Sequence, residues 1–169
     1  NSIDEIWKIF KLDGLILSGG NTLADYADKT DGSESTSIER DTYEKALLKK
    51  AISTRTPVLG VCRGLQIINV FYNGKLEKIK GHAGTRHSIK LENSKYTNNV
   101  PSEVNSFHNY GVPRKNLGKE LVPLAHDDDD NIEAFYHEKD KILGIMWHPE
   151  REKIPVQKDC KLIKSLFRS

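Results

Sequence analysis

The chain contains two cysteines, and one of them stands between glycines at a spacing that suits a nucleophile. Cys62 has Gly60 two residues before it and Gly64 two residues after it, and it follows the apolar run 58–61. Glycines at these positions permit the sharp strand-to-helix turn that lifts a nucleophile above a sheet. The N-terminus of the following helix favours a thiolate, and the backbone N–H of Arg63 can donate to an oxyanion. We therefore predict that Cys62 is a thiol nucleophile.

A thiol nucleophile needs a base, and the base needs a partner that orients it. His148 and Glu150 lie two residues apart, on either side of Pro149, after the apolar run 142–147. With the turn fixed by the proline, Glu150 can hold the tautomer of His148, which predicts a Cys-His-Glu catalytic triad. The tripeptide alone is also compatible with an ordinary surface histidine. A second oxyanion donor is predicted in the backbone N–H of Gly20, which ends another apolar run.

The elements that must position these groups are short strands and helices of an α/β domain. The runs 14–18 and 58–61 do not alternate with polar residues, which is typical of strands buried on both faces of a parallel sheet. Capping-box spacing at Thr36 to Glu39 predicts a helix over 37–52, and the nearly all-apolar segment 65–72 predicts a buried helix. Between the first strand and the first of these helices, the polar stretch 21–37 is predicted to be a long surface loop.

The second half of the chain has a different pattern. Strand-like pieces follow one another without helical segments between them, which favours antiparallel hairpins; they lie at 88–91, 104–107, 121–125, 132–136 and 142–147. The last segment, 159–167, has one apolar face and predicts an amphipathic helix.

Length and composition bound the possible functions. The 169 residues fit one domain over 1–169, and 37% hydrophobic with 30% charged residues excludes global disorder. Lys and Arg number 26 against 24 Asp and Glu, interspersed, so no nucleic-acid partner is predicted. No apolar run reaches the ~20 residues of a membrane span, and acidic residues stand where a signal peptide would be basic, so we predict a cytoplasmic protein with no membrane partner. The chain begins at Asn1 without Met, and we expect residues before it.

Other residues with chemical potential carry weaker predictions. His82 and His87 flank a predicted hairpin and a two-histidine metal site is conceivable, but no carboxylate pattern lies near them. We therefore expect no metal and no cofactor, and a structural or pocket-lining role for both histidines. Cys160 is expected to be an inert thiol. The acidic run from Asp127 to Asp130 is predicted to be a solvated turn.

Together the motifs resemble those of the class I glutamine amidotransferase superfamily. The resemblance rests on G-x-C-x-G-x-Q at Gly60 to Gln66 and H-P-E at His148 to Glu150. The Cys-Arg-Gly elbow, the loop after Gly20, the run Arg40 to Glu44 and the segment Val104 to His108 are similar to the γ-glutamyl hydrolase branch, which is peptidase C26-like. The resemblance covers Leu12 to about Glu152. It implies a flavodoxin-like α/β domain, a mostly parallel sheet with an antiparallel extension, and a missing N-terminal strand and helix.

A finer resemblance concerns the substrate. The segments Ser106 to Asn109, Ile132 to Phe135 and Gly144 to His148 are similar to those of bacterial hydrolases of γ-glutamyl nucleotide phosphoramidates used in capsule modification. The family implies that the γ-glutamyl group is held by a set of residues comprising Asn21, Gln66, Ser106, Phe107 and His108. Many members carry Asp where this chain has Thr22, so no substrate contact of that Asp is carried over.

The predicted function is hydrolysis of a γ-glutamyl amide through a glutamyl thioester on Cys62. The predicted substrate is a small molecule, either a γ-glutamyl nucleotide phosphoramidate or a γ-glutamyl amine. One alternative is a glutaminase subunit that delivers ammonia to a partner synthase. Another is a catalytically silent interaction module, against which the intact triad residues argue. The sequence does not determine the leaving amine or the oligomeric state.

Overall fold

The helices and strands are described from a computed structural model that covers residues 2–28 and 34–168. Part of the predicted polar loop, residues 29–33, lies outside the described residues. The α-helices are α1 Ser2–Phe10, α2 Ile38–Ser53, α3 Arg63–Phe71 and α4 Gln157–Phe167. The strands are β1 Leu15–Leu17, β2 Val58–Val61, β3 Glu77–Lys78, β4 Ala83–Ser88, β5 Lys90–Leu91, β6 Glu103–Phe107, β7 Tyr110–Gly111, β8 Val122–His126, β9 Ile132–His137 and β10 Ile142–Ile145. Short 3₁₀ helices are η1 Thr97–Asn99, η2 Arg114–Asn116 and η3 Pro149–Arg151.

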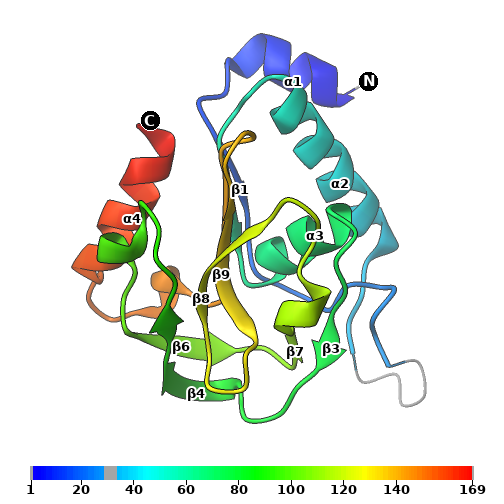
Figure 1. Cartoon of the computed structure of the whole chain (residues 1–169). Helices are drawn as coiled ribbons and strands as arrows, with labels where there is room; N and C mark the ends of the chain where they lie inside the picture. The colour runs from blue at the N-terminus through cyan, green and yellow to red at the C-terminus, as the bar shows by residue number, and fades with distance from the viewer. Residues whose placement is uncertain (1, 29–33, 169) are drawn as a thin grey trace.

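The central sheet has six strands in the order β1-β2-β10-β9-β8-β5 (Figure 1). Strands β1, β2 and β10 run parallel to one another, and β9, β8 and β5 extend the sheet with antiparallel pairings. Two short antiparallel pairs, β3 with β7 and β4 with β6, form separate ribbons. The predicted α/β class, with parallel strands and an antiparallel extension, is confirmed.

Helices cover both faces of this sheet, with α2 and α3 on one side and α4 on the other (Figure 1). Strand alternation divides the apolar side chains between two cores. Val58 packs with Leu48 of α2 and Leu65 of α3, whereas the next residue, Leu59, packs with Leu162 of α4. All five side chains are at most 2% exposed. The non-alternating apolar runs of the sequence are therefore explained by burial on both faces.

Helix α2 forms close to its predicted range because a serine caps its first turn. Ser37 has an extended backbone, and its hydroxyl accepts a hydrogen bond from the Arg40 backbone N–H at 3.2 Å. This satisfies one of the N–H groups that a helix start leaves without an intrahelical partner. Ser37 is thus the cap, one residue after the Thr36 that the capping-box spacing suggested.

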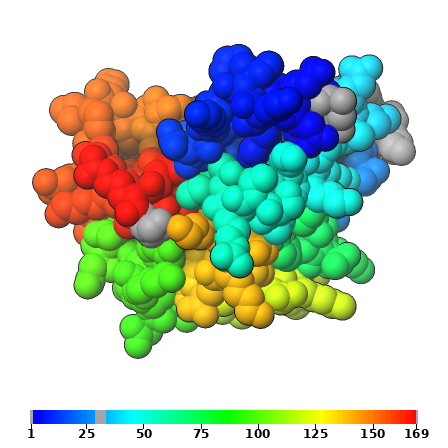
Figure 2. All heavy atoms as spheres, turned by 90° about the horizontal axis from the view of Figure 1, so that it is seen from above, coloured from blue at the N-terminus to red at the C-terminus, as the bar shows by residue number. Residues whose placement is uncertain are grey.

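Helix α1 was not predicted from the sequence. It lies beside the C-terminal half of α2, and Figure 2 shows the two helices side by side, α1 in blue and α2 in cyan. The indole N–H of Trp7 donates to the Thr54 hydroxyl at 3.1 Å, and Asp4 pairs with Lys50 at 2.6 Å. Ile3, Ile6, Trp7 and Phe10 follow helical spacing, so the sequence does contain a signal for this helix.

The predicted strands of the second half are found as β6, β8, β9 and β10, while the predicted strand 88–91 is divided between β4 and β5. The predicted C-terminal helix is α4. Within the part of the chain that the structure describes, no helix is long and apolar enough to cross a bilayer.

The turn from β2 into α3 is tight enough to require glycine on both sides of Cys62. A Cβ atom on Gly64 would lie 2.0 Å from the Leu17 carbonyl oxygen, and one on Gly60 would lie 2.6 Å from the Gly64 carbonyl oxygen. The backbone N–H of Cys62 donates to the Ile145 carbonyl at 2.8 Å. The ends of β1, β2 and β10 are therefore in direct contact, and the residues that follow them share one edge of the sheet.

Candidate active site

Cys62 occupies a strained backbone position at the end of β2. Its φ of 50° and ψ of −102° lie in a region that side-chain-bearing residues rarely adopt, and it is the residue before the first turn of α3. Such strain persists only where the surrounding structure enforces it, and it is concentrated at functional sites. The side chain is 5% exposed, so the thiol lies just below the surface rather than deep in the core. A strained residue between the end of β2 and the start of α3 is the backbone geometry predicted for a nucleophile elbow at Cys62.

The resting protonation state of Cys62 differs from the sequence expectation of a thiolate. Burial raises the pKa of the Cys62 thiol to about 12. The Arg63 backbone N–H and the Arg151 side chain lower it, and the Glu133 and Glu150 carboxylates raise it, but burial is the largest effect. The helix N-terminus therefore does not prevail over loss of solvation. Burial therefore favours the protonated thiol over the thiolate near neutral pH.

The His148 ring lies beside Gly19 at the same edge of the sheet and has one nitrogen that can accept a proton. Its Nδ1 lies 2.6 Å from Glu150 Oε1, and its Nε2 is buried without a hydrogen-bond partner among the described residues. A carboxylate on Nδ1 places the ring hydrogen there, which leaves a lone pair on Nε2. The ring of Phe107 meets the His148 ring edge to face, with centroids 5.8 Å apart. The imidazole is thus fixed by one hydrogen bond and one aromatic contact.

The backbone of His148 is held by a residue that the sequence analysis did not assign. Asn105 of β6 accepts a hydrogen bond from the His148 N–H and donates one to the His148 carbonyl, both at 2.8 Å. It also donates to Glu152 at 2.7 Å. Asn105 lies inside the segment Val104 to His108 that carried the family resemblance, but nothing in its spacing showed that it faces the strand end carrying His148.

The loop after β1 presents the second predicted oxyanion donor. Arg40 donates to the Gly19 carbonyl at 3.1 Å and to the Ser18 carbonyl at 3.2 Å. Because C=O and N–H point in opposite directions in a trans peptide, the Gly20 N–H is turned away from Arg40. Among the described residues this N–H has no acceptor. Gly20 lines the pocket that also contains Cys62.

The side chain of Arg63 does not enter this pocket. It is 1% exposed and pairs with Asp41 and with Glu44, both on α2. Glu44 also accepts a hydrogen bond from Arg40 at 2.8 Å. Asp41 accepts one from the Ala24 backbone N–H at 2.8 Å. Arg63 therefore offers its backbone N–H to the site while its guanidinium anchors the elbow to α2.

The pocket above the thiol has a volume of about 110 Å³. Its walls come from the loop 20–22, the elbow at Cys62 and Arg63, Gln66 of α3 and the segment 107–110. Most of these side chains are polar, which suits a small polar group rather than an apolar one. Of the residues predicted to hold substrate, Asn21, Gln66, Phe107 and His108 line this pocket.

Ser106 is placed differently from the prediction. Its side chain is fully buried, and its hydroxyl donates to the His82 carbonyl at 2.6 Å. Successive residues of a strand face opposite sides, so Ser106 points away from the side on which Asn105 and Phe107 lie. The Ser106 side chain therefore holds the loop before β4, and a role of Ser106 in holding substrate stays a prediction.

Known proteins share this arrangement of elements. A sequence model of the peptidase C26 family matches residues 3–150 of the chain. The γ-glutamyl-CDP-amidate hydrolase of Campylobacter jejuni is 38% identical over 138 residues, which cover 82% of this chain and 62% of that protein. A glutamine-hydrolysing GMP synthase subunit of Methanococcus vannielii is 29% identical over 151 residues, which cover 88% of this chain and 70% of that protein.

Solved structures support the fold. A putative GMP synthase subunit from Thermoplasma acidophilum superposes with a TM-score of 0.74 at 22% identity, covering 98% of this chain and 75% of that one. A glutamine amidotransferase from Thermotoga maritima superposes with a TM-score of 0.64 at 16% identity, covering 90% of this chain and 64% of that one. This chain spans between 62% and 66% of the length of its relatives from Campylobacter, Lactococcus and Schizosaccharomyces.

The raised pKa of Cys62 predicts slow alkylation near neutral pH. Iodoacetamide attacks the thiolate, and a thiol with a pKa of about 12 is almost wholly protonated at neutral pH. In a Cys160→Ala chain the rate should rise about tenfold per pH unit from pH 7 to pH 10. Peptide mass spectrometry of quenched samples measures the rate of Cys62 alkylation at each pH. A rate that reaches its plateau below pH 9 would contradict this assignment.

Proposed function

Because this chain belongs to the peptidase C26 family, we propose that it hydrolyses γ-glutamyl amides through a glutamyl thioester on Cys62. The observation that carries the proposal is the pairing of His148 with Glu150 at 2.6 Å, with the opposite ring nitrogen free and buried. A base held in one tautomer is what a protonated thiol requires. In this proposal Cys62, His148 and Glu150 form the catalytic triad.

In the first half of the proposed reaction, Cys62 Sγ attacks the γ-carbonyl carbon and its proton passes to His148 Nε2. The carbonyl electron pair moves onto oxygen, where the N–H groups of Gly20 and Arg63 donate to the oxyanion. The intermediate collapses, the C–N bond breaks, and His148 returns its proton to the leaving nitrogen. The amine departs, and the glutamyl group stays on sulfur as a thioester.

In the second half, water takes the place of the amine. His148 removes a proton from the water as its oxygen attacks the thioester carbonyl, and the same N–H groups receive the second oxyanion. The C–S bond then breaks, the sulfur regains the proton from His148, and glutamate leaves. Glu150 stabilises the imidazolium formed twice in this cycle.

The size of the pocket supports a small acyl group with a larger leaving group outside it. A cavity of about 110 Å³ is well below the ~300–1,000 Å³ of sites that enclose drug-sized ligands. Phe107 is 41% exposed at its rim, and the Arg151 guanidinium lies 4.3 Å from the Phe107 ring. An aromatic ring and a cation at the mouth suit a base and a phosphate. We therefore propose a γ-glutamyl nucleotide phosphoramidate as the first candidate substrate and a γ-glutamyl amine as the second.

The likeness to the Campylobacter jejuni hydrolase supports the same substrate class. A role in capsule biosynthesis, implied by the motif resemblance in the sequence, is part of the proposal. A cytoplasmic location stays a prediction from the sequence. The likeness to GMP synthase subunits favours a second candidate, a glutaminase that supplies ammonia to a partner synthase. The two candidates share the acyl group and differ in the leaving amine and in the need for a partner.

The hydrolase proposal predicts that the isolated chain releases glutamate without a partner. We expect fast release from a γ-glutamyl nucleotide phosphoramidate, slower release from a γ-glutamyl amine and little from glutamine. Cys62→Ala should lower kcat by at least ~10⁴-fold because no thioester can form, and Cys160→Ala should leave kcat unchanged. A coupled assay of released glutamate measures the rate with each of the three substrates. Glutamate release confined to glutamine and stimulated by a synthase would contradict the hydrolase proposal and favour the glutaminase. No glutamate release from any substrate would favour a catalytically silent module.

Arg151 provides a separate test of the leaving group. We expect Arg151→Gln to raise KM for the phosphoramidate about tenfold, because a charged hydrogen bond to phosphate is lost. The KM for a γ-glutamyl amine should stay within about twofold, since that substrate has no phosphate. Lys153→Gln is the matched control, which removes a nearby exposed cation and should change neither KM. An equal rise in KM for both substrates would show that Arg151 does not recognise the phosphate.

A further inference from the structure

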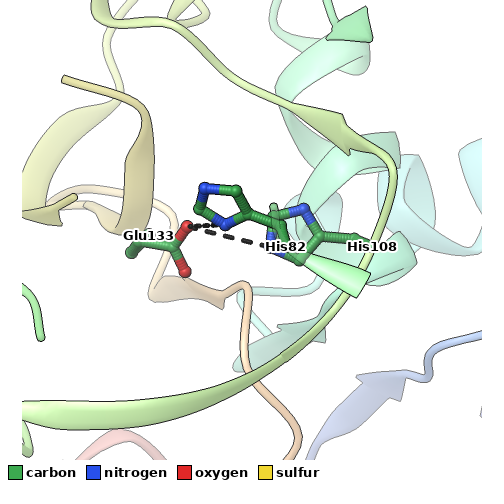
Figure 3. A group of neighbouring side chains, drawn as sticks. All are labelled: His82, His108 and Glu133. Carbon is green, nitrogen blue, oxygen red and sulfur yellow. Dashed lines mark ion pairs between the residues drawn. The ribbon is translucent and has the colours of Figure 1, made fainter. Parts of the chain in front are cut away.

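A second cluster of titratable side chains includes His108, which also lines the pocket above Cys62. Glu133 of β9 has a side chain that is 1% exposed, and among the described residues neither carboxylate oxygen has a hydrogen-bond partner. Imidazole nitrogens of His82, His87 and His108 lie 3.8, 3.7 and 3.8 Å from its Oε1. Figure 3 shows the His82 and His108 rings beside the Glu133 carboxylate. These distances are too long for hydrogen bonds.

A buried carboxylate without hydrogen bonds needs a positive charge beside it. Two kinds of charge are possible at this place: a proton on a histidine, or a metal cation between the histidines and the carboxylate. The hydrogen-bond partners of the opposite ring nitrogens distinguish between them, because they determine which nitrogen of each neutral ring carries a hydrogen.

His108 has its hydrogen on the far side of the ring. Its Nδ1 lies 3.0 Å from the Tyr110 carbonyl oxygen, which can only accept. This contact assigns the hydrogen of the neutral ring to Nδ1. In that form Nε2 carries a lone pair, and this lone pair is on the side of Glu133. A lone pair and a carboxylate repel each other unless a cation lies between them.

His82 has the same arrangement with its two nitrogens exchanged. Its Nε2 lies 3.2 Å from Asp127 Oδ2, so the hydrogen belongs on Nε2 and the lone pair on Nδ1, toward Glu133. Nδ1 also approaches Ser106 Oγ at 3.4 Å, but that hydroxyl already donates to the His82 carbonyl at 2.6 Å. Ser106 therefore has no second hydrogen to give to the ring.

Asp127 is itself fixed, contrary to the prediction of a wholly solvated acidic turn. It is 5% exposed and accepts hydrogen bonds from the Asn131 side chain at 2.8 Å and from the backbone N–H groups of Asp129 and Asn131 at 2.9 and 2.8 Å. A histidine whose outer nitrogen is held by a carboxylate or a backbone carbonyl is the usual support of a metal-binding imidazole. His82 and His108 each have one of these supports.

We propose that His82, His108 and Glu133 bind a divalent transition-metal ion, for which Zn²⁺ is the best match. Their three ligand atoms lie within 4.8 Å of one another. Two imidazoles and one carboxylate are a ligand set that Zn²⁺ uses at bond lengths near ~2.0–2.2 Å. The edge of such a tetrahedron is about 3.3 Å, so the 3.8 Å nitrogen–oxygen separations need to close by about 0.5 Å. Mg²⁺ and Ca²⁺ are disfavoured because they prefer oxygen ligands.

The ion would join three segments that are distant in sequence. His82 precedes β4, His108 follows β6, and Glu133 lies on β9. His108 also lines the pocket above Cys62, so the ion would fix one wall of that pocket without contacting the reacting atoms. Its role is positioning, and the proposal is independent of which γ-glutamyl amide the protein cleaves. His87, the third imidazole near Glu133, is available as a further ligand.

Zinc binding is tested in a Cys62→Ala chain, because the Cys62 thiol and His148 could bind the ion themselves. After dialysis against a chelator, Zn²⁺ is titrated in competition with a chromophoric chelator, and Co²⁺ is added separately for its visible spectrum. We expect one ion per chain and Co²⁺ bands typical of four-coordinate nitrogen and oxygen ligation. Adding Glu133→Gln or His82→Gln should weaken Zn²⁺ binding by more than ~100-fold.

His126→Gln and His137→Gln are the matched controls, since neither histidine belongs to the cluster. Both should leave the affinity unchanged. If Glu133→Gln or His82→Gln does not fold by circular dichroism, the Co²⁺ spectrum of the Cys62→Ala chain decides. Absence of those Co²⁺ bands, or equal Zn²⁺ affinity with and without Glu133→Gln, would overturn the proposal and assign the compensating charge to an imidazolium.

Discussion

The buried guanidinium of Arg63 is the constraint on which the candidate active site depends. It pairs with Asp41 and Glu44 of α2 immediately after the cysteine of the elbow. Glu44 in turn holds Arg40, which donates to the carbonyl oxygens of the loop that follows β1. Removing one partner of a buried ion pair typically costs about 3–5 kcal/mol, because the other charge is left uncompensated. This network therefore fixes both backbone N–H groups proposed for the oxyanion hole.

The packing around the elbow also affects the protonation of the Cys62 thiol. Cys62 lies at a positive φ among packed strand ends, where burial favours the neutral thiol over the thiolate. His148 reaches this edge because β10 is paired in parallel with β2. Asn105 and Glu150 then fix its backbone and its ring. In the proposed mechanism, backbone N–H groups stabilise the oxyanion and the free nitrogen of His148 transfers the proton.

Sequence patterns predicted the features that depend only on residues close together in the chain. The apolar runs 14–18 and 58–61 predicted β1 and β2, and the glycine spacing around Cys62 predicted the sharp turn between β2 and α3. Features that depend on distant segments could not be predicted. The hydrogen bonds between the Asn105 side chain and the His148 backbone, for example, join positions 43 residues apart. Likewise, the carboxylate that faces His82 comes from β9, so the absence of a nearby acidic pattern was no guide. The buried side chain of Asp127 was hidden within an acidic run that otherwise suggested solvent.

Trapping by hydroxylamine is the most direct test of the proposed glutamyl thioester on Cys62. A thioester partitions between water and hydroxylamine whichever step limits the rate. We expect that adding hydroxylamine to the isolated protein and a γ-glutamyl substrate produces γ-glutamyl hydroxamate, that the glutamate share of the products falls to match, and that the amine released equals glutamate plus hydroxamate. Turnover that yields glutamate alone at every hydroxylamine concentration would contradict a covalent intermediate.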